Sequence, residues 1–301
     1  MQLVGFGEGR VGKVVGDRVY DLTALVPSPD LPLAFKAPSS MMRLISGWAE
    51  VRAIAEANAP EWANFALADL RLVAPLVDPS KIVAAPINYS DHMSEMHETH
   101  DVSHLGVFLK APSSIVGHGA TVHLPYSDRR FDQEGELALI VGRRGHDIDV
   151  DDALDFVFGY TGLLDITMRG GEDRSTRKSF DTFTPMGPSI VTADEFGDPG
   201  NVDLRCWVNE DLRQHATTKD FIWTVPQLIS YVSSVMTLEV GDVISTGTPA
   251  GVGPVSAGDT IHLELANAAT TIGRLSVHVS QTSRTSVTHG TGSGPVPPQP
   301  K

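Results

Sequence analysis

The chain has 301 residues, of which 41% are hydrophobic, so it can supply the core of one large or two ordinary domains. Its formal net charge of -14, with no basic run to offset it, argues against a nucleic-acid or anionic-membrane binder. An anionic substrate would therefore need a local positive centre. The single cysteine, Cys206, excludes an internal disulfide and a cysteine-based zinc site. With no signal-peptide pattern and no apolar run of the ~20 residues that span a bilayer, we expect a cytoplasmic protein that contacts no membrane.

Residues 1–76 form a candidate N-terminal domain of their own. Short strand patterns at 2–6, 12–15 and 18–22 are separated by Gly and Asp, and an apolar periodicity over 41–58 predicts a helix. Prolines then punctuate the route into a larger region. We expect a small α/β domain followed by a separate, larger one.

The stretch 131–142, FDQEGELALIVG, holds two acidic residues next to an apolar run. Glu134 and Glu136 are two apart, and the period of a strand sends both carboxylates to one face. Burying them without a partner would be unfavourable by several kcal/mol, and a divalent cation with oxygen ligands would compensate them. The alternative is an exposed strand with two solvated glutamates, which is the commoner situation for acidic side chains.

Three histidines lie within nine residues of the segment 88–100. His92 and Glu95 are three apart, so on a helical turn they share a face, and the carboxylate can orient the imidazole. Such a pair can act as a general base that activates water. The alternative is a polar surface loop with incidental histidines.

Two further polar residues stand at the ends of apolar strand patterns. Asp165 interrupts the run 155–167; an aspartate there is commonly a turn residue or a cap, but it could also be a third oxygen ligand beside the two glutamates. Three carboxylates would leave positions on Mg²⁺ or Mn²⁺ for substrate and water. Lys110 ends a strand pattern at 108–110, where a lysine is usually solvated.

The C-terminal half contains the clearest helix signal of the chain, at 224–236. Thr224 can cap it, Pro226 suits its first turn, and its apolar side chains form one stripe that belongs in a core. A strand at 241–245 precedes a glycine-rich turn whose amides could hold an anion. Residues 281–301 are rich in Ser, Thr, Gly and Pro without periodicity and predict a disordered tail.

Six motifs follow one another along the chain: NYSDHMSE (88–95), FLKAPSS (108–114), DQEGELALIVG (132–142), GYTGLLDIT (159–167), KSFDTFTPMGP (178–188) and GDVISTGTPAGVG (241–253). In this order they resemble the fumarylacetoacetate hydrolase family, over nearly all of residues 1–280. One motif would be a weak signal, whereas six in order are specific. The resemblance implies a strand-rich α+β fold, a roll of mixed sheets of β-clip type, with the catalytic domain at 77–280, the small N-terminal domain before it, and a homodimer.

The resemblance also implies roles for individual residues. The metal ligands would be Glu134, Glu136 and Asp165, binding Mg²⁺ or Mn²⁺. The catalytic residues would be His92 and Glu95, on a mobile lid that activates water, and Lys178 near the metal. The substrate-binding residues would be Tyr89, Lys110, Arg169 and Thr248.

The implied chemistry is the cleavage of a C–C bond in a 2,4-dioxo acid, such as an acylpyruvate or a fumarylpyruvate-like compound. Chelation of the 2-oxo acid would polarise its carbonyl and stabilise the enolate that forms when the neighbouring bond breaks. Without attacking water, the same enolate would serve a decarboxylase or a keto-enol isomerase of 2-oxo or 2-hydroxydienoic acids. A third alternative is a pseudoenzyme that binds but does not react.

One position departs from the family's pattern. The family often has glutamine three residues after the arginine, whereas this chain has Glu172 after Arg169. Glutamine can donate to a substrate carboxylate and ionised glutamate cannot. We therefore hypothesise that Glu172 turns away or faces a neutral group, and that small dianions such as oxaloacetate are disfavoured substrates.

Overall fold

The computed structural model describes residues 1–28, 37–57 and 62–286, and within them strands predominate. The strands are β1 (Gln2–Phe6), β2 (Arg10–Val15), β3 (Arg18–Asp21), β4 (Asn64–Ala66), β5 (Leu72–Val73), β6 (Ile82–Ala84), β7 (Phe108–Lys110), β8 (Ile115–Val116), β9 (Thr121–Leu124), β10 (Phe131–Gln133), β11 (Gly135–Val141), β12 (Val157–Leu164), β13 (Thr167–Met168), β14 (Thr184–Thr192), β15 (Asp203–Val208), β16 (Asp211–Thr217), β17 (Val243–Ser245), β18 (Gly253–Pro254), β19 (Thr260–Ala266) and β20 (Thr271–Gln281). The α-helices are α1 (Ser40–Ser46), α2 (Trp48–Glu56), α3 (Ser90–Glu95), α4 (Val102–Leu105), α5 (Arg174–Lys178), α6 (Ala193–Phe196) and α7 (Val225–Val235). The predicted strand-rich α+β class is confirmed.

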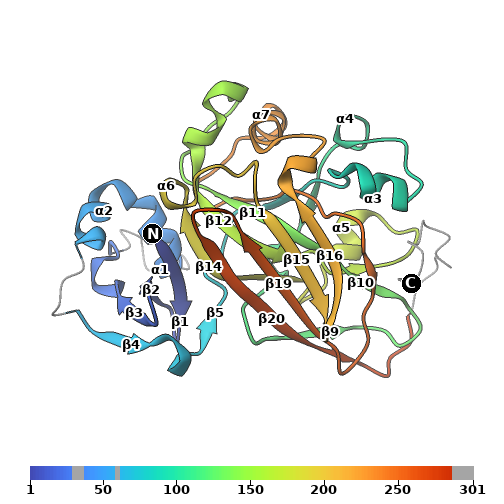
Figure 1. The fold of residues 1–301 in the computed structure, drawn as a ribbon, viewed down its shortest axis with the longest axis horizontal. Helices are drawn as coiled ribbons and strands as arrows, with labels where there is room; N and C mark the ends of the chain where they lie inside the picture. Colours follow the sequence, from blue (N-terminus) through green and yellow to red (C-terminus); the bar gives the residue numbers. More distant parts are fainter. Residues whose placement is uncertain (29–36, 58–61, 287–301) are drawn as a thin grey trace.

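The strands form three sheets. The largest runs in the order β4-β3-β2-β1-β14-β12-β11-β17-β6-β7, with β5 beside β1 and β8 beside β14. A five-stranded sheet, β16-β15-β19-β20-β9, packs across β11, β12 and β14 (Figure 1). The third sheet is small and has the order β13-β10-β18.

The N-terminal strands are joined to the large sheet by the antiparallel pairing of β1 with β14. Figure 1 shows these strands at one end of the molecule, with α1 and α2 beside them. The division at residue 76 therefore stays a prediction, because main-chain hydrogen bonds run across it.

Strand β11 lies at the centre of the fold and is buried along its whole length. Its residues alternate between two hydrophobic cores: Leu137, Leu139 and Val141 enter one, and Ala138 and Ile140 enter the other. A strand covered on both faces explains the continuous apolar run that follows the two glutamates in the sequence. The acidic residues therefore stand at the edge of a dry interior.

The strongest helix prediction is confirmed, and the weaker one is only partly right. Thr224 caps α7 in a capping box with Gln227. The predicted helix over 41–58 is instead two helices, because the chain bends at Gly47. A Cβ at Gly47 would lie 2.7 Å from the ring of Pro27, so only glycine fits at this close approach.

The C-terminal segment is ordered further than the sequence predicts. Strand β20 continues through Gln281, whose side chain donates to the carbonyl of Tyr126. Ser286 donates through its backbone N–H and its hydroxyl to Asp128. The first part of the predicted tail therefore packs on the loop at 125–130, and the rest of it lies outside the described residues.

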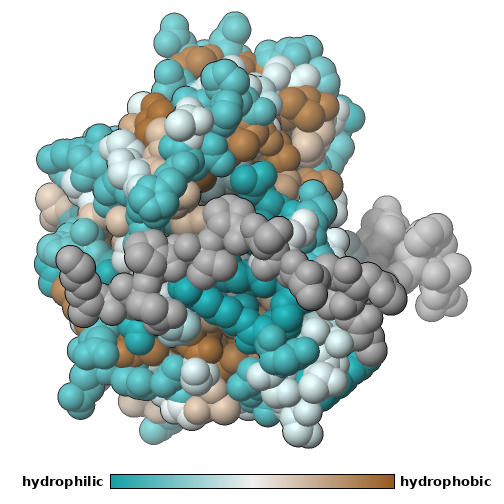
Figure 2. All heavy atoms as spheres, turned by 90° about the vertical axis from the view of Figure 1, so that its right-hand side faces the viewer, coloured by the Kyte–Doolittle hydropathy of each residue, from teal (hydrophilic) through white to brown (hydrophobic). Residues whose placement is uncertain are grey.

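The face at the right-hand side of Figure 1 is largely hydrophilic, with separate hydrophobic patches (Figure 2). In the ranges that the structure describes, no helix is both long and apolar enough to cross a membrane. That face carries α3 and α5, which contribute to the site described below.

Cys206 lies on β15 with no exposed surface, and burial raises the pKa of its thiol to about 12. At about pH 8 the group is protonated, and a protonated, buried thiol is a poor nucleophile. We predict that iodoacetamide leaves the native chain unlabelled and labels one thiol per chain in denaturant, as measured by mass spectrometry. Rapid labelling of the native protein would contradict this packing.

Candidate active site

Three buried carboxylates meet where β11 and β12 pair. Glu134 lies at the break between β10 and β11, Glu136 is the second residue of β11, and Asp165 follows the last residue of β12. The antiparallel register sets Gly135 opposite Leu164, and the Asp165 N–H donates to the Glu134 carbonyl at 2.8 Å. One oxygen from each of the three carboxylates lies within 4.8 Å of the others. The structure thus brings together the three residues predicted as metal ligands.

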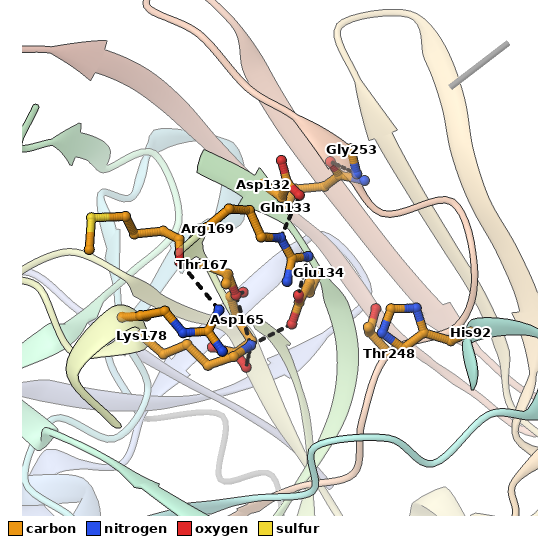
Figure 3. Close-up of polar contacts among 12 residues, drawn as sticks. His92, Asp132, Gln133, Glu134, Asp165, Thr167, Arg169, Lys178, Thr248 and Gly253 are labelled. Carbon is orange, nitrogen blue, oxygen red and sulfur yellow. Dashed lines mark hydrogen bonds and ion pairs between the residues drawn. The ribbon is translucent and has the colours of Figure 1, made fainter. Parts of the chain in front are cut away.

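Buried ammonium and guanidinium groups offset two of the three carboxylates. Lys178 Nζ donates to Glu134 at 2.6 Å and to Asp165 at 2.5 Å, and Lys110 Nζ donates to the other oxygen of Asp165 at 2.5 Å. Arg169 donates to Glu134 at 2.8 Å (Figure 3). Burial by itself would raise the pKa of Glu134, but the charges of Lys178 and Arg169 outweigh it and hold that pKa below its usual range.

Glu136 differs from its neighbours, because no basic side chain pairs with it among the described residues. It accepts hydrogen bonds from the Ser245 hydroxyl at 2.5 Å and the Gly247 N–H at 2.9 Å. Burial, reinforced by the charge of Asp165, raises the pKa of Glu136 to about 8. Among the described residues, Glu136 is thus the carboxylate of the cluster whose charge no basic side chain offsets.

A divalent cation fits this arrangement. All three groups are carboxylates, the hard oxygen ligands that Mg²⁺ and Mn²⁺ prefer. A cation beside Glu136 would supply the charge that the described side chains do not. The buried hydroxyl of Tyr89 is a further polar atom without a hydrogen-bond partner in the described part of the chain.

His92 and Glu95 lie on the short helix α3, and their ring nitrogen Nδ1 and carboxylate Oε2 are 3.0 Å apart, as the three-residue spacing predicts. The other oxygen of Glu95 accepts the Gly251 N–H at 3.0 Å. Because the carboxylate accepts from Nδ1–H, the second ring nitrogen, Nε2, is left to accept a proton. In the view of Figure 3, the His92 ring overlaps Thr248, on the opposite side of Glu134 from Lys178.

Gly251 is held in a conformation that only glycine adopts readily. Its φ is +95°, and a Cβ there would lie 1.8 Å from the carbonyl oxygen of Arg213. The glycine-rich turn was predicted to hold an anion through its amides, and the anions that it holds are carboxylates of the protein itself. The Gly251 N–H donates to Glu95, and the Gly247 N–H donates to Glu136.

A cavity of ≈ 150 Å³ opens onto these groups. Four of the residues predicted for the site line it: His92, Glu134, Arg169 and Lys178. A general base, a metal-ligand candidate and two cations thus face one small volume.

Three of the predicted substrate-binding residues do not line this cavity. Lys110 uses its ammonium group on Asp165 and on the carbonyls of Lys178 and Phe183, so it positions the acidic cluster and is not solvated. The hydroxyl of Thr248 donates to the Gly135 carbonyl at 3.0 Å and accepts from Gln214. The ring of Tyr89 packs on Phe221, and burial raises the pKa of its hydroxyl, which stays a neutral donor. We assign these residues supporting roles as proposals.

Glu172 turns away from the cavity, as one arm of the hypothesis above expects. Both of its carboxylate oxygens pair with Arg129, each at 2.9 Å. This ion pair is half-buried at the surface of the loop before α5, and it neutralises the charge that sequence analysis expected to repel dianions.

Sequence reasoning missed several supporting groups. Ser245 and Gln214 bond to the site from strands far from it in the chain, and nothing in their local sequence marks them. Asp132, which accepts from Arg169, does carry a signal, because it alternates with the two glutamates in the sequence. Arg174 and Arg177, which also line the cavity, carry a signal that could have been used, since they precede Lys178 in a basic cluster with helical spacing.

Comparison with known proteins identifies the family of the chain. The family model described as Fumarylacetoacetate (FAA) hydrolase C-terminal matches residues 81–280. The chain belongs to the fumarylacetoacetate hydrolase family. It is 40% identical over 279 residues to a maleylpyruvate hydrolase of Aquipseudomonas alcaligenes, covering 88% of this chain and 96% of that protein. The resemblance found in the sequence is confirmed.

Two solved structures extend the comparison. The maleylpyruvate hydrolase from Sphingobium sp. SYK-6, in complex with manganese(II) and pyruvate, has a TM-score of 0.82 at 39% identity and covers 94% of this chain and 100% of its own. A 2-hydroxyhepta-2,4-diene-1,7-dioate isomerase from Mycobacterium marinum has a TM-score of 0.65 at 36% identity, with 74% of this chain and 82% of its own covered. Hydrolases and isomerases thus share this fold.

We predict that Glu136→Gln lowers the affinity for Mn²⁺ more than the substitution of a residue that only orients a ligand, because it removes the charge of a ligand. Ser245→Ala, which removes only the hydroxyl that orients Glu136, should lower the affinity by about 10- to 100-fold. Calorimetric titration with Mn²⁺ measures both effects, and Glu264→Gln, on the exposed face of β19, is the matched control. Equal Mn²⁺ affinity in wild type and Glu136→Gln would exclude this carboxylate as a ligand.

Proposed function

We propose that this chain is a divalent-metal-dependent hydrolase that cleaves a C–C bond in a 2,4-dioxo acid of the acylpyruvate or maleylpyruvate type. The observation that carries the proposal is the cavity itself, where His92, oriented by Glu95, faces Glu134 of the acidic cluster. The similarity to maleylpyruvate hydrolases over most of the chain supports this reaction class.

Glu134, Glu136 and Asp165 would hold the cation, which we propose to be Mg²⁺ or Mn²⁺. When bound, it supplies a Lewis acid that polarises the 2-oxo group of the substrate. The Mn²⁺ and pyruvate in a relative's structure support both the metal and a 2-oxo acid as its partner.

His92 would act on water. Its Nε2 takes a proton from a water molecule, the water oxygen bonds to C4 of the substrate, and the bond between C3 and C4 breaks. The electron pair of that bond stays on C3 as the enolate of pyruvate, and the carbonyl side leaves as a carboxylic acid. The proton on His92 is then available to return to C3.

The cations around the cavity would stabilise the charge that develops. Lys178 is held by three acceptors, Glu134, Asp165 and the hydroxyl of Thr167, so its position is set before substrate binds. Opposite charges of Asp165 and Glu134 outweigh burial and raise the pKa of Lys178, which stays an ammonium group. A fixed positive charge of this kind needs no reorganisation as the reaction proceeds.

A keto-enol isomerase or decarboxylase remains the second candidate. The structural similarity to a 2-hydroxyhepta-2,4-diene-1,7-dioate isomerase supports it, since the same base could move a proton at C3 without adding water. Products separate the candidates: hydrolysis gives pyruvate and a second acid, isomerisation shifts a double bond, and decarboxylation releases CO₂. The homodimer and the cytoplasmic location stay predictions.

We predict that purified chain with Mg²⁺ or Mn²⁺ splits an acylpyruvate into pyruvate and a carboxylic acid, and that EDTA abolishes the reaction. His92→Asn should lower kcat by about 10²- to 10⁴-fold, the usual contribution of a general base. His215→Asn, at an exposed histidine of β16, is the control. A panel of acylpyruvates, oxaloacetate and unsaturated 2-hydroxydioates, with products identified by mass spectrometry, decides between the reaction classes.

We also predict that Glu95→Gln lowers kcat by about 10²-fold or more while Mn²⁺ affinity changes by less than about twofold. The carboxylate accepts from both the Gly251 N–H and the His92 ring, whereas an amide has one oxygen and must present its NH₂ to one of these donors. The imidazole then loses the orientation that leaves Nε2 free. A kcat equal to that of wild type would show that the pair does not act as a base.

A further inference from the structure

The helix α5 presents two arginines to the candidate active site. Arg174 and Arg177 are three residues apart, so they share one face of the helical turn, and both line the cavity that Glu134 and Lys178 line. The cavity thus has the acidic cluster at one part of its wall and two guanidinium groups at another.

These two arginines lack the partners that the other cations of the site have. Arg169 pairs with Asp132 and Glu134, and Lys178 pairs with Glu134 and Asp165. Among the described residues, neither Arg174 nor Arg177 forms an ion pair with a carboxylate. The two are therefore surplus positive charges at the cavity.

Arg177 is held in place but not saturated. Its Nε donates to the Glu172 carbonyl at 2.8 Å, and its Nη1 lies 3.5 Å from the Met168 carbonyl. These bonds orient the guanidinium plane, whereas Nη2 has no acceptor in the part of the chain that the structure describes. The residue thus has a set orientation and donors to spare, as an anion-binding arginine requires.

The surroundings make an empty subsite unfavourable. Burial, reinforced by the charges of Arg169 and Arg174, lowers the pKa of Arg177 from its usual range. A guanidinium group keeps its proton in proteins, so the free-energy cost consists first of desolvation and then of repulsion from Arg169 and Arg174. An anion bound between the arginines would remove that repulsion.

The nearby carboxylates do not fill this role. Glu98 lines the same cavity, but its Oε1 accepts from the backbone N–H groups of Thr99 and His100 and lies 3.0 Å from the His100 ring. Glu172 is committed to Arg129. The position in front of the two arginines is therefore left for a ligand.

We propose that Arg177, with Arg174 beside it, binds a second carboxylate of the substrate, at the end remote from the 2-oxo acid, so that this site selects dianionic oxo acids. The proposal rests on the proposed function and adds to it the residues that distinguish a maleylpyruvate-type dianion from an acylpyruvate with an uncharged tail. It also reverses the consequence drawn from Glu172 in the sequence, because that charge is paired and faces away.

Binding of two matched ligands tests the subsite without turnover. The ligands 2-oxoglutarate and 2-oxopentanoate have equal chain length, and only the former ends in a carboxylate. Calorimetry on the Mn²⁺-loaded chain should show 2-oxoglutarate binding about 10-fold or more tightly, the usual range for a charge-assisted arginine pair. Equal affinities in wild type would overturn the proposal.

Variants locate the preference. Arg177→Met should reduce the ratio of the two affinities to within about twofold of one, and Arg177→Lys, which keeps the charge but not the planar fork, should retain an intermediate ratio. Arg174→Met should reduce the ratio in part, and it keeps the test valid if Arg177→Met does not fold, because Arg174 is half-exposed and its side chain forms no hydrogen bond among the described residues. Arg144→Met, at an exposed arginine, is the control.

Turnover separates this inference from the proposed function. The test uses two 2,4-dioxo acids that differ only at the distal end, where one has a carboxylate and the other a carboxamide. Arg174→Met and Arg177→Met should each lower kcat/KM for the carboxylate substrate and leave kcat/KM for the carboxamide substrate unchanged. Equal losses on both substrates would assign the arginines a purely structural role and overturn the inference. If wild type cleaves neither substrate but prefers 2-oxoglutarate in binding, the proposed function fails and the anion subsite stands.

Discussion

The structure depends on the compensation of carboxylates that are buried at the end of the central strands. Glu134, Glu136 and Asp165 have almost no exposed surface, and isolated charges in such a place would be strongly destabilising. Lys110 and Lys178 are buried with them, bonded to the acids and to main-chain carbonyls. The ends of β7, β12 and α5 bring these opposite charges together. A cluster of this kind contributes little net stability compared with a well-packed apolar core, so its presence points to chemistry.

Close packing of the backbone positions the two glutamates. Gly135 stands between them, and a Cβ there would lie 2.9 Å from the side chain of Leu263 and 3.1 Å from Cβ of Cys206. The five-stranded sheet therefore presses against the chain at the point where the carboxylates diverge. The Gly135 N–H donates to Gln214, and its carbonyl accepts from Thr248. The glutamates are thus held by a main chain that has little freedom to shift, which suits a site that must bind a cation in one geometry.

Local patterns predicted those parts of the fold and site that depend on neighbours in sequence. The α7 capping box, and the turn of helix that joins His92 to Glu95, follow from spacings of three residues. The alternation of β11 between two cores follows from the period of a strand. In each of these elements the interacting groups are a few residues apart, so the sequence alone contains the whole interaction.

The remaining features depend on contacts between distant segments. The sequence predicts that Lys110 is a solvated residue at the end of a strand. In the structure, the pairing of β7 with β6 places it at the acidic cluster, where it binds Asp165, which lies 55 residues further along the chain. That Glu172 turns away was one of two alternatives in the sequence, and the partner that holds it there, Arg129, lies 43 residues away. The close approach of Pro27 to Gly47 is likewise a contact between segments that are separate in the sequence. Charge pairing between distant positions leaves no periodic trace in a single sequence, so these roles required the structure.

The charge of the whole chain and the charge of the cavity have opposite signs, which bears on substrate choice. With a net charge of -14, the protein repels anions at long range, yet screening in physiological salt limits that repulsion to about 8 Å. Inside the cavity, Arg174 and Arg177 remain without ion-pair partners in the described structure, while most nearby cations are consumed by the acidic cluster. Selectivity for an anion therefore arises only at contact. In the proposed mode of binding, the 2-oxo acid end of the substrate meets the cation held by the acidic wall, and a second carboxylate meets the arginines of the basic wall.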